Sequence, residues 1–179
     1  MAETLVEWSD LLVTRDGPAA QLVLHCEPAD APALAAAAGL TLPGAMLRAE
    51  RTAGWRALHL APDEWLLIGP VAERDRVVGR IEAADVPRSL VDVGERGLTL
   101  RVEGGAATAL LNAGCPLDLS NRAFPPGACT RTLFGKATVV LERSHDADCF
   151  RMQYGRSFDG YVIGLIRAAA TDLPEARPS

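Results

Sequence analysis

The sequence is poor in aromatic side chains and has no excess of basic ones. Aromatic residues make up 5% of its 179 residues, and 18 lysines and arginines are outnumbered by 23 aspartates and glutamates, which gives a formal net charge of −5. A nucleic-acid-binding protein usually presents a basic face to the phosphates and aromatic rings to the bases. The composition therefore argues against a nucleic-acid partner.

Cysteines are few and widely spaced. Cys26, Cys115, Cys129 and Cys149 form no CxxC pair, and no histidine stands near them at the spacing of zinc ligands. We interpret all four as free, reduced thiols and expect no metal site in this chain.

A leader-like start and long apolar runs are also missing. The segment from Met1 to Trp8 holds two acidic residues and no basic stretch that leads into an apolar one, so it does not resemble a secretory signal. Every apolar run is interrupted well short of the length that crosses a membrane. We expect a cytoplasmic protein with no membrane association.

Residues capable of chemistry are present, but they form no complete catalytic set. His25 and His59 fall within alternating apolar segments. Ser144-His145-Asp146 contains the residue types of a catalytic triad, but triads are assembled from separate loops, so we interpret it as a hairpin turn. The sequence therefore predicts no catalytic residue and no cofactor-binding residue.

Two glycine-containing motifs resemble phosphate-binding loops only in part. Gly104-Gly105 precedes a predicted helix but lacks the further glycines of a dinucleotide-binding loop. Gly135-Lys136 leads into a predicted strand, which removes the helix N-terminus that would hold a phosphate. We interpret both as turns.

The spacing of apolar residues predicts a mixed α+β fold. Strands are expected at residues 20–26, 55–60, 64–68, 89–93, 98–102, 129–134, 137–142 and 149–154, and helices at 30–38, 71–84, 104–113 and 158–169. Residues 41–54 are expected to be mostly loop. Because most strands are joined by hairpin-length turns, α+β is favoured over a parallel sheet. We expect two ferredoxin-like β-α-β-β-α-β units packed together.

The predicted domain spans residues 1–173, with possible halves at about 18–87 and 88–173 and a frayed tail at 174–179. In the last helix, Ser157 is expected to be the N-cap, and an apolar stripe is expected to pack on a sheet; its members are Phe158, Tyr161, Val162, Leu165, Ile166 and Ala169. Gly160 and Gly164 each cost this helix about 1 kcal/mol, which close packing against a neighbouring element would explain.

The long connection at residues 114–127 differs from ordinary scaffold. It contains three prolines, a lone Arg122, and Phe124 directly before two prolines. Loops of this length are uncommon unless they bind something. Phe124 is expected either to project as a rigid aromatic anchor for a partner or to pack back onto its own core.

Several blocks, in order along residues 55–170, resemble the γ subunit of heterotetrameric sarcosine oxidase. They are Pro62-Asp-Glu-Trp-Leu-Leu-Ile, Ser89-Leu-Val-Asp-Val, Gly114-Cys-Pro-Leu-Asp-Leu, Arg122-Ala-Phe-Pro-Pro-Gly-Ala-Cys, Arg131-Thr-Leu-Phe-Gly-Lys-Ala and Arg156-Ser-Phe-Asp-Gly-Tyr. The resemblance implies a fold like half of the folate-binding fold of the glycine-cleavage aminomethyltransferase.

The resemblance also implies a function. Enzymes of this family oxidatively demethylate sarcosine to glycine, and the methyl carbon passes to tetrahydrofolate or leaves as formaldehyde while oxygen is reduced to hydrogen peroxide. Their α subunit carries NAD and folate sites, the β subunit carries FAD and FMN, and the δ subunit binds zinc. The γ subunit is implied to be non-catalytic and without a cofactor of its own.

The resemblance further offers six residues as interface or loop-shaping candidates toward the α, β and δ partners. They are Arg122, Phe124, Pro125, Pro126, Arg131 and Lys136.

Three other functions stay open at the level of sequence. The chain could serve a sister enzyme that demethylates another secondary amine. It could also be a stand-alone folate-dependent protein like the aminomethyltransferase, in which Asp92 or Asp118 would orient the pterin. A regulatory module that binds a small ligand is compatible with the α+β order.

Overall fold

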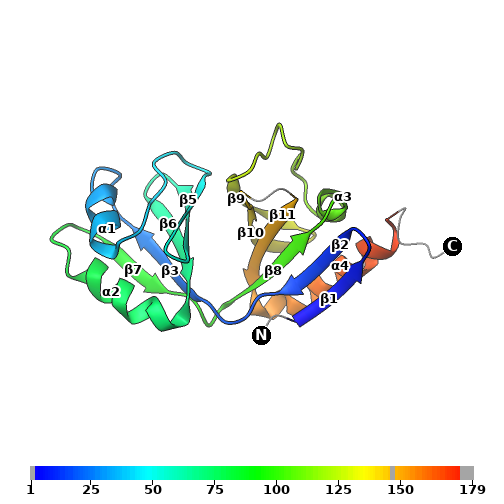
Figure 1. The fold of residues 1–179 in the computed structure, drawn as a ribbon, viewed down its shortest axis with the longest axis horizontal. Helices are drawn as coiled ribbons and strands as arrows, with labels where there is room; N and C mark the ends of the chain where they lie inside the picture. The colour runs from blue at the N-terminus through cyan, green and yellow to red at the C-terminus, as the bar shows by residue number, and fades with distance from the viewer. Residues whose placement is uncertain (1–2, 146–147, 174–179) are drawn as a thin grey trace. The chain divides into compact units, whose positions relative to one another are not determined.

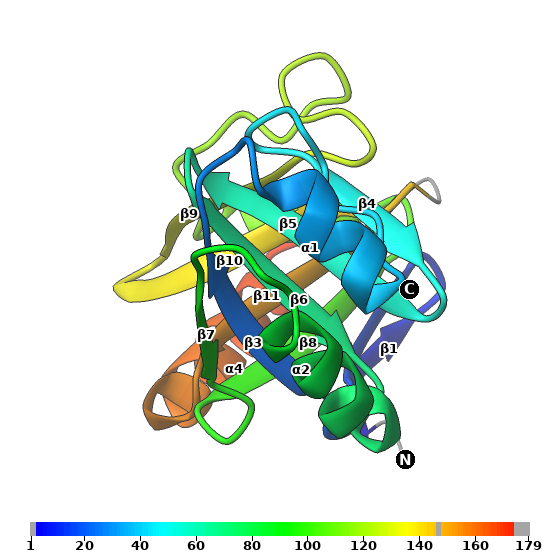
Figure 2. The same ribbon diagram turned by 90° about the vertical axis from the view of Figure 1, so that its left-hand side faces the viewer.

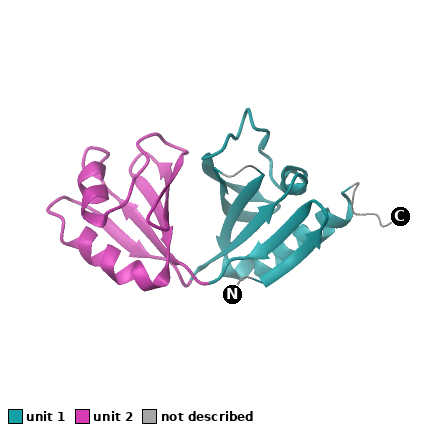
Figure 3. Ribbon diagram, viewed as in Figure 1, with its two compact units in different colours: residues 1–17, 96–179 teal, residues 18–95 magenta. Residues whose placement is uncertain are grey.

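The computed structural model describes residues 3–145 and 148–173 and divides into two compact units (Figure 3). Unit 1 combines residues 1–17 with 96–179, and unit 2 is the continuous segment 18–95. Among the described residues, each unit contains one antiparallel sheet and two α-helices (Figure 1). The α+β prediction is therefore confirmed. Within the described residues, no helix is both long and apolar enough to span a membrane.

Unit 2 is built on a five-stranded sheet with the order β4-β5-β6-β3-β7. Its strands are β3 (Ala20–His25), β4 (Ala49–Thr52), β5 (Trp55–Ala61), β6 (Glu64–Gly69) and β7 (Ser89–Asp92), and its helices are α1 (Ala31–Ala38), the 3-10 turn η1 (Val71–Glu73) and α2 (Arg74–Glu82). The two α-helices contact each other and lie on the same face of the sheet (Figure 2).

The core of unit 2 lies between these helices and the sheet. The strands contribute Trp55, Trp65 and Leu67, and the helices contribute Leu34 and Ile81, each with at most 1% of its surface exposed. Burying each such aliphatic side chain stabilises the fold by about 1.5–3 kcal/mol. Alternation along residues 55–60 and the turn residues before residue 64 predict this hairpin correctly.

Unit 1 is built on a six-stranded sheet with the order β1-β2-β8-β11-β10-β9. Its strands are β1 (Glu3–Trp8), β2 (Leu11–Arg15), β8 (Gly97–Glu103), β9 (Cys129–Phe134), β10 (Ala137–Arg143) and β11 (Cys149–Gly155), and its helices are α3 (Ala107–Asn112), the 3-10 turn η2 (Arg156–Phe158) and α4 (Asp159–Thr171). The helices and the sheet share one apolar core that includes Leu100, Leu110, Phe150 and Ile166.

The two units share a topology that the sequence does not reveal as a repeat. The sheet order β5-β6-β3-β7 in unit 2 is the ferredoxin-like order, and β10-β11-β8-β2 in unit 1 is equivalent. Other strands lie at the edges of the two sheets: β4 beside β5 in unit 2, and β9 and β1 at the two edges in unit 1. The predicted pair of ferredoxin-like units is confirmed in strand order, with one change in connectivity.

That change concerns the fourth strand of each unit. Residues 88–93 were expected to open the second half, but β7 pairs with β3, as in Val23 opposite Val91, and closes unit 2. The fourth position in unit 1 is filled by β2, from the start of the chain, which pairs with β8. The division therefore falls after residue 95 and not after 87, and residues 1–17 belong to unit 1.

The first turn of α4 is tied to β2. Arg15 Nη2 donates hydrogen bonds to both carboxylate oxygens of Asp159, each at 2.9 Å. The hydroxyl of Tyr154 donates to Asp159 Oδ1 at 2.9 Å. Burial and the Asp159 carboxylate raise the pKa of Tyr154, so this hydroxyl stays protonated and keeps donating. These bonds anchor the N-terminal hairpin in unit 1.

The last helix differs from its prediction in three details. Val162, Ile166 and Ala169 are buried as expected, but Phe158 and Tyr161 are 40% and 42% exposed. Ser157 lies inside η2, and the residue that caps α4 is Phe158, which makes no side-chain capping bond. A β-carbon at Gly160 or Gly164 would meet no atom within 4 Å in the described chain, so close packing does not explain these glycines. The predicted tail at 174–179 lies outside the described residues.

Candidate functional site

The long connection between α3 and β9 is held by a buried arginine. Arg143, at the end of β10, is only 2% exposed. Its Nη1 donates to the carbonyl oxygens of Leu119 at 3.0 Å and Phe124 at 3.2 Å. Its guanidinium lies 4.9 Å from the ring centre of Phe150, a cation–π distance. Arg143 therefore fixes the loop from inside the unit.

Phe124 is part of the core and not an exposed anchor. It is 6% exposed and stacks on Phe150 with ring centres 6.4 Å apart. Of the two alternatives for Phe124, packing onto its own core is the correct one. Replacing Phe124 would destabilise unit 1 itself, so loss of a partner after such a change would not locate an interface.

The remaining predicted interface residues lie at the surface of unit 1. Arg122 and Pro126 are exposed on the loop, and Pro125 is half-buried. Arg131 is exposed on β9, an edge strand of the sheet, and Lys136 is exposed in the turn that follows it. Arg131 and Lys136 thus lie at the β9 edge of this sheet, called here the basic edge of unit 1.

The Gly135-Lys136 turn is docked on α4. The amide of Lys136 donates to the Tyr161 hydroxyl at 3.0 Å. Gly135 has a φ of +57°, and a β-carbon there would lie 2.3 Å from the Tyr161 hydroxyl oxygen. This position requires glycine for both reasons. The motif is a turn, as predicted.

The Gly104-Gly105 motif likewise contacts another part of the chain, at Asp10. The Gly105 amide donates to the Asp10 carboxylate at 2.9 Å, and a β-carbon at Gly104 would meet the Asp10 carbonyl oxygen at 2.2 Å. An internal carboxylate thus takes the amide that a phosphate would use. This glycine pair joins the β1–β2 turn to the start of α3.

The two carboxylates considered for pterin binding cap local turns. Asp92 accepts the Gly94 amide at 2.8 Å and pairs with Arg74. Asp118 accepts the Ser120 amide at 2.9 Å. These amide bonds lower the pKa of both carboxyl groups, so both are ionised at neutral pH. Asp92 belongs to unit 2 and Asp118 to unit 1.

Cys26, Cys115, Cys129 and Cys149 are free and buried. Burial raises the pKa of Cys26 and of Cys149, which makes both weak nucleophiles. Among residues 3–145 and 148–173, no three histidine, cysteine, aspartate or glutamate side chains are grouped to hold a metal ion. Ser144 is buried, and Asp146 of the predicted Ser-His-Asp turn lies outside the described residues.

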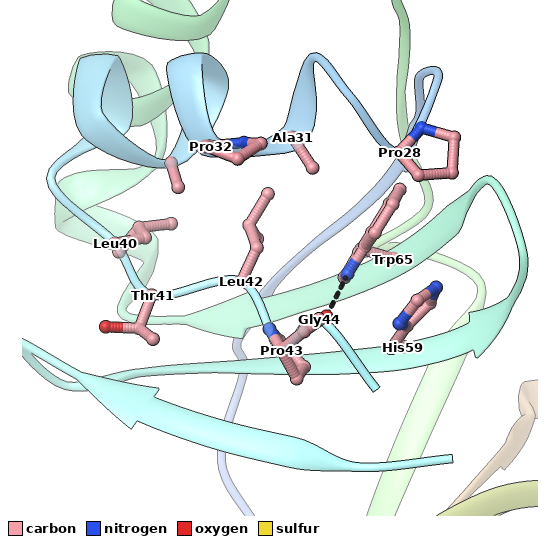
Figure 4. A pocket seen from close by; sticks show the side chains of 11 residues that line it. Pro28, Ala31, Pro32, Leu40, Thr41, Leu42, Pro43, Gly44, His59 and Trp65 are labelled. Atoms are coloured by element: carbon pink, nitrogen blue, oxygen red, sulfur yellow. Dashed lines mark hydrogen bonds between the residues drawn. The ribbon is translucent and has the colours of Figure 1, made fainter. Parts of the chain in front are cut away.

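A pocket in unit 2 was not anticipated from the sequence (Figure 4). Its volume is approximately 340 Å³, near the lower end of the range for ligand pockets. One wall is α1, with Ala31 and Ala35; a second is the segment from Leu40 to Gly44; and the floor contains His59 and Trp65. The lining is mostly aliphatic, and its one titratable side chain is His59.

The floor of the pocket is a fixed aromatic pair. His59 and Trp65 stack with ring centres 4.3 Å apart, and Trp65 Nε1 donates to the Pro43 carbonyl at 3.0 Å. His59 is 4% exposed, its Nε2 lies 3.4 Å from the Pro62 carbonyl oxygen, and its buried Nδ1 has no hydrogen-bond partner. The sequence places His59 inside an alternating strand, and the register of β5 with β6 puts it opposite Trp65.

The sequence of this chain matches one protein family and two of its members. The family model described as sarcosine oxidase, gamma subunit family, matches residues 24–172. The sarcosine oxidase subunit gamma of Corynebacterium sp. strain U-96 is 33% identical over 147 residues, which are 80% of this chain and 70% of that protein. The same subunit of Corynebacterium sp. strain P-1 is 34% identical over 139 residues, 76% of this chain and 68% of that protein.

Two solved structures share the fold. A chain of the heterotetrameric sarcosine oxidase from Corynebacterium sp. U-96 in complex with pyrrole 2-carboxylate superposes with a TM-score of 0.82 at 26% identity, covering 94% of this chain and 87% of that one. The glycine cleavage system aminomethyltransferase T from Bartonella henselae has a TM-score of 0.64 at 13% identity, covering 85% of this chain and 44% of that one, a likeness of fold alone. From the family match and the identity to both subunits, this chain belongs to the sarcosine oxidase gamma subunit family.

Proposed function

We propose that this chain is the γ subunit of a cytoplasmic heterotetrameric sarcosine oxidase and that it contributes binding surface to the assembly instead of catalytic groups. The observation that carries the proposal is the match of nearly its whole length to a chain of such a heterotetramer. The partners would be the α, β and δ subunits. The four cysteines are free and buried, which supports a reducing compartment, because disulfides form mainly in oxidising ones.

The chemistry would lie on the partners. The complex would oxidise sarcosine to glycine and pass the methyl carbon to tetrahydrofolate or release it as formaldehyde, with hydrogen peroxide as the reduced product. FAD, FMN, NAD, zinc and tetrahydrofolate would be held by the other subunits. In this chain, the candidate folate carboxylates Asp92 and Asp118 are engaged in their own turns. This favours a structural role over a stand-alone aminomethyltransferase-like activity.

The test is co-expression of this chain with the α, β and δ subunits, followed by size-exclusion chromatography and a sarcosine-dependent peroxide assay. We expect the chain to co-elute with the flavin absorbance and its omission to lower the stability or activity of the complex. A chain that elutes alone as a stable monomer and binds tetrahydrofolate would contradict the proposal. Assays with other secondary amines distinguish a sister demethylase from a sarcosine oxidase.

A further inference from the structure

Unit 2 is inserted into a hairpin of unit 1. The strands β2 and β8 are neighbours in the sheet of unit 1, with Arg15 opposite Leu100, and the amide of Asp16 donates to the carbonyl oxygen of Thr99 at 2.9 Å. The chain leaves unit 1 directly after this bond and returns to it at residue 96. The whole of unit 2 therefore occupies the place of the turn between two paired strands.

The two ends of unit 2 are also joined to each other. Its first strand, β3, pairs with its last strand, β7, with Leu22 opposite Asp92. The amide of Val93 donates to the carbonyl oxygen of Gln21 at 2.8 Å. The sheet of unit 2 is thus closed by strands of one continuous segment, and the two ends of that segment lie side by side.

Each unit also has its own apolar core. In unit 2, the buried cluster and the side chains packed against it come from residues 20–90, and in unit 1 they come from residues 5–13 and 98–173. The core of unit 2 therefore needs one continuous segment, whereas the core of unit 1 needs residues from before and after that segment. Domains generally fold as units, and the one whose segment is made first can form first.

The folding of unit 2 shortens the loop between β2 and β8. Before unit 2 folds, the whole flexible segment 18–95 joins these strands, and closing such a loop costs entropy. Once β3 and β7 are paired, only a few residues on each side separate β2 from β8. The cost grows as three-halves of RT times the logarithm of loop length, so a loop shortened tenfold lets its ends meet about thirtyfold more often. A folded unit 2 therefore favours the pairing of β2 with β8.

We propose that unit 2 folds first and brings β2 beside β8, so that the N-terminal hairpin of β1 and β2 docks last and completes unit 1. During synthesis this hairpin is made before unit 2 and stays undocked until β8 has been made. When it docks, Val13 becomes fully buried and Arg15 binds Asp159 at the start of α4. This order of folding rests on strand pairing and does not depend on the proposed function.

The tryptophans allow the folding of unit 2 to be followed in the full chain. Trp55 and Trp65, both in unit 2, are each 1% exposed, and the third tryptophan, Trp8, lies on β1. In a Trp8→Phe background, tryptophan fluorescence therefore reports unit 2 alone. Pulse-labelling hydrogen exchange with mass spectrometry reports when residues 11–15 become protected. Unfolding for only a few seconds before refolding keeps the X-Pro bonds in their native isomers, because they isomerise over about 10–100 s.

Two core substitutions in this background test the order. Leu22→Ala weakens the core of unit 2 on β3, and Val13→Ala, the control, weakens the core of unit 1 on β2; both side chains are fully buried. We expect Leu22→Ala to slow the fluorescence change and the protection of β2 by the same factor, at least about threefold. We expect Val13→Ala to leave the rate of the fluorescence change as it was, even where unit 1 does not complete. Should Leu22→Ala not fold, Ile81→Val removes less volume from the same core and should slow both signals by a common factor.

Protection of β2 ahead of the fluorescence change, or protection at an unchanged rate in Leu22→Ala, would overturn the proposal. A slower fluorescence change in Val13→Ala would overturn it as well, because the folding of unit 2 would then depend on the docking of the hairpin.

Discussion

The guanidinium of Arg143 and the carbonyl oxygen of Phe124, 19 residues apart in sequence, are joined by a hydrogen bond of 3.2 Å. This bond and its companion to the Leu119 carbonyl turn a proline-rich connection into a fixed part of unit 1. The loop is therefore held by hydrogen bonds from inside unit 1 to its own carbonyl groups. Its exposed residues, such as Arg122, are available to a partner.

Arg143→Met should lower the free energy of unfolding by about 2–4 kcal/mol, because it leaves two buried carbonyl groups without donors while keeping most of the side-chain volume. Urea unfolding followed by circular dichroism measures the change. Arg122→Met, on the exposed part of the same loop, is the control and should stay within about 0.5 kcal/mol of wild type. Equal stability of the two variants would show that the buried bonds contribute nothing.

Gly135→Ala should destabilise the chain by about 1–3 kcal/mol, since the residue has a positive φ and its β-carbon would overlap the Tyr161 hydroxyl. Thermal unfolding measures the loss. Tyr161→Phe in the same chain should recover part of it by removing the overlapping oxygen, and a double-mutant cycle gives the coupling. Strictly additive effects would argue against the contact.

Gly164→Ala should stabilise the chain by about 0.5–1 kcal/mol. The residue lies within α4, a β-carbon there meets no atom within 4 Å, and alanine has the higher helix propensity. The isolated chain should therefore melt at a higher temperature. If assembly with the other subunits is weakened at the same time, a partner packs closely on this face of the helix.

The stability contributed by Asp92 should disappear in acid. The Gly94 amide, together with the Arg74 guanidinium, lowers the pKa of Asp92 below its ordinary value of 3.8. A carboxyl group whose pKa is lower in the folded chain stabilises it above the unfolded pKa and loses that effect as the pH falls through the folded value. The stability difference between wild type and Asp92→Asn should thus shrink below about pH 4, as measured by urea titrations at several pH values. A difference that is constant down to pH 2 would contradict this assignment.

Lys136 is the only lysine in the sequence, and it offers a direct test of the basic edge of unit 1. An amine-reactive reagent should acetylate Lys136 in the isolated chain, because its side chain is exposed. In the assembled enzyme we expect the rate to fall at least about tenfold, as burial in an interface restricts access. Peptide mass spectrometry gives the rate, with the Gly135-Lys136 peptide of the isolated chain as reference. An unchanged rate would remove Lys136 from the interface candidates.

Local patterns in the sequence determined most of the individual elements. The β5–β6 hairpin, helix α1 with its terminal Gly39, and the buried positions of α4 follow from alternation, helical spacing and turn residues, which act over a few residues. The mixed α+β class also follows from the succession of strands and helices. The chemically plausible motifs at Gly104 and Gly135 were identified as turns for the same reason, since each lacked the neighbouring residues that a phosphate site needs.

Only the tertiary structure decided which strands complete each sheet and which side chains of the loop are exposed. β2 pairs with β8, with Leu12 opposite Glu103, and β7 pairs with β3, because pairing depends on the partner strand and not on the segment's own sequence. Phe124 is buried because Arg143 and Phe150, both distant in sequence, surround it. The His59–Trp65 pocket likewise exists only when α1 is laid against the sheet, since no local pattern specifies where a helix and a strand from separate segments enclose space.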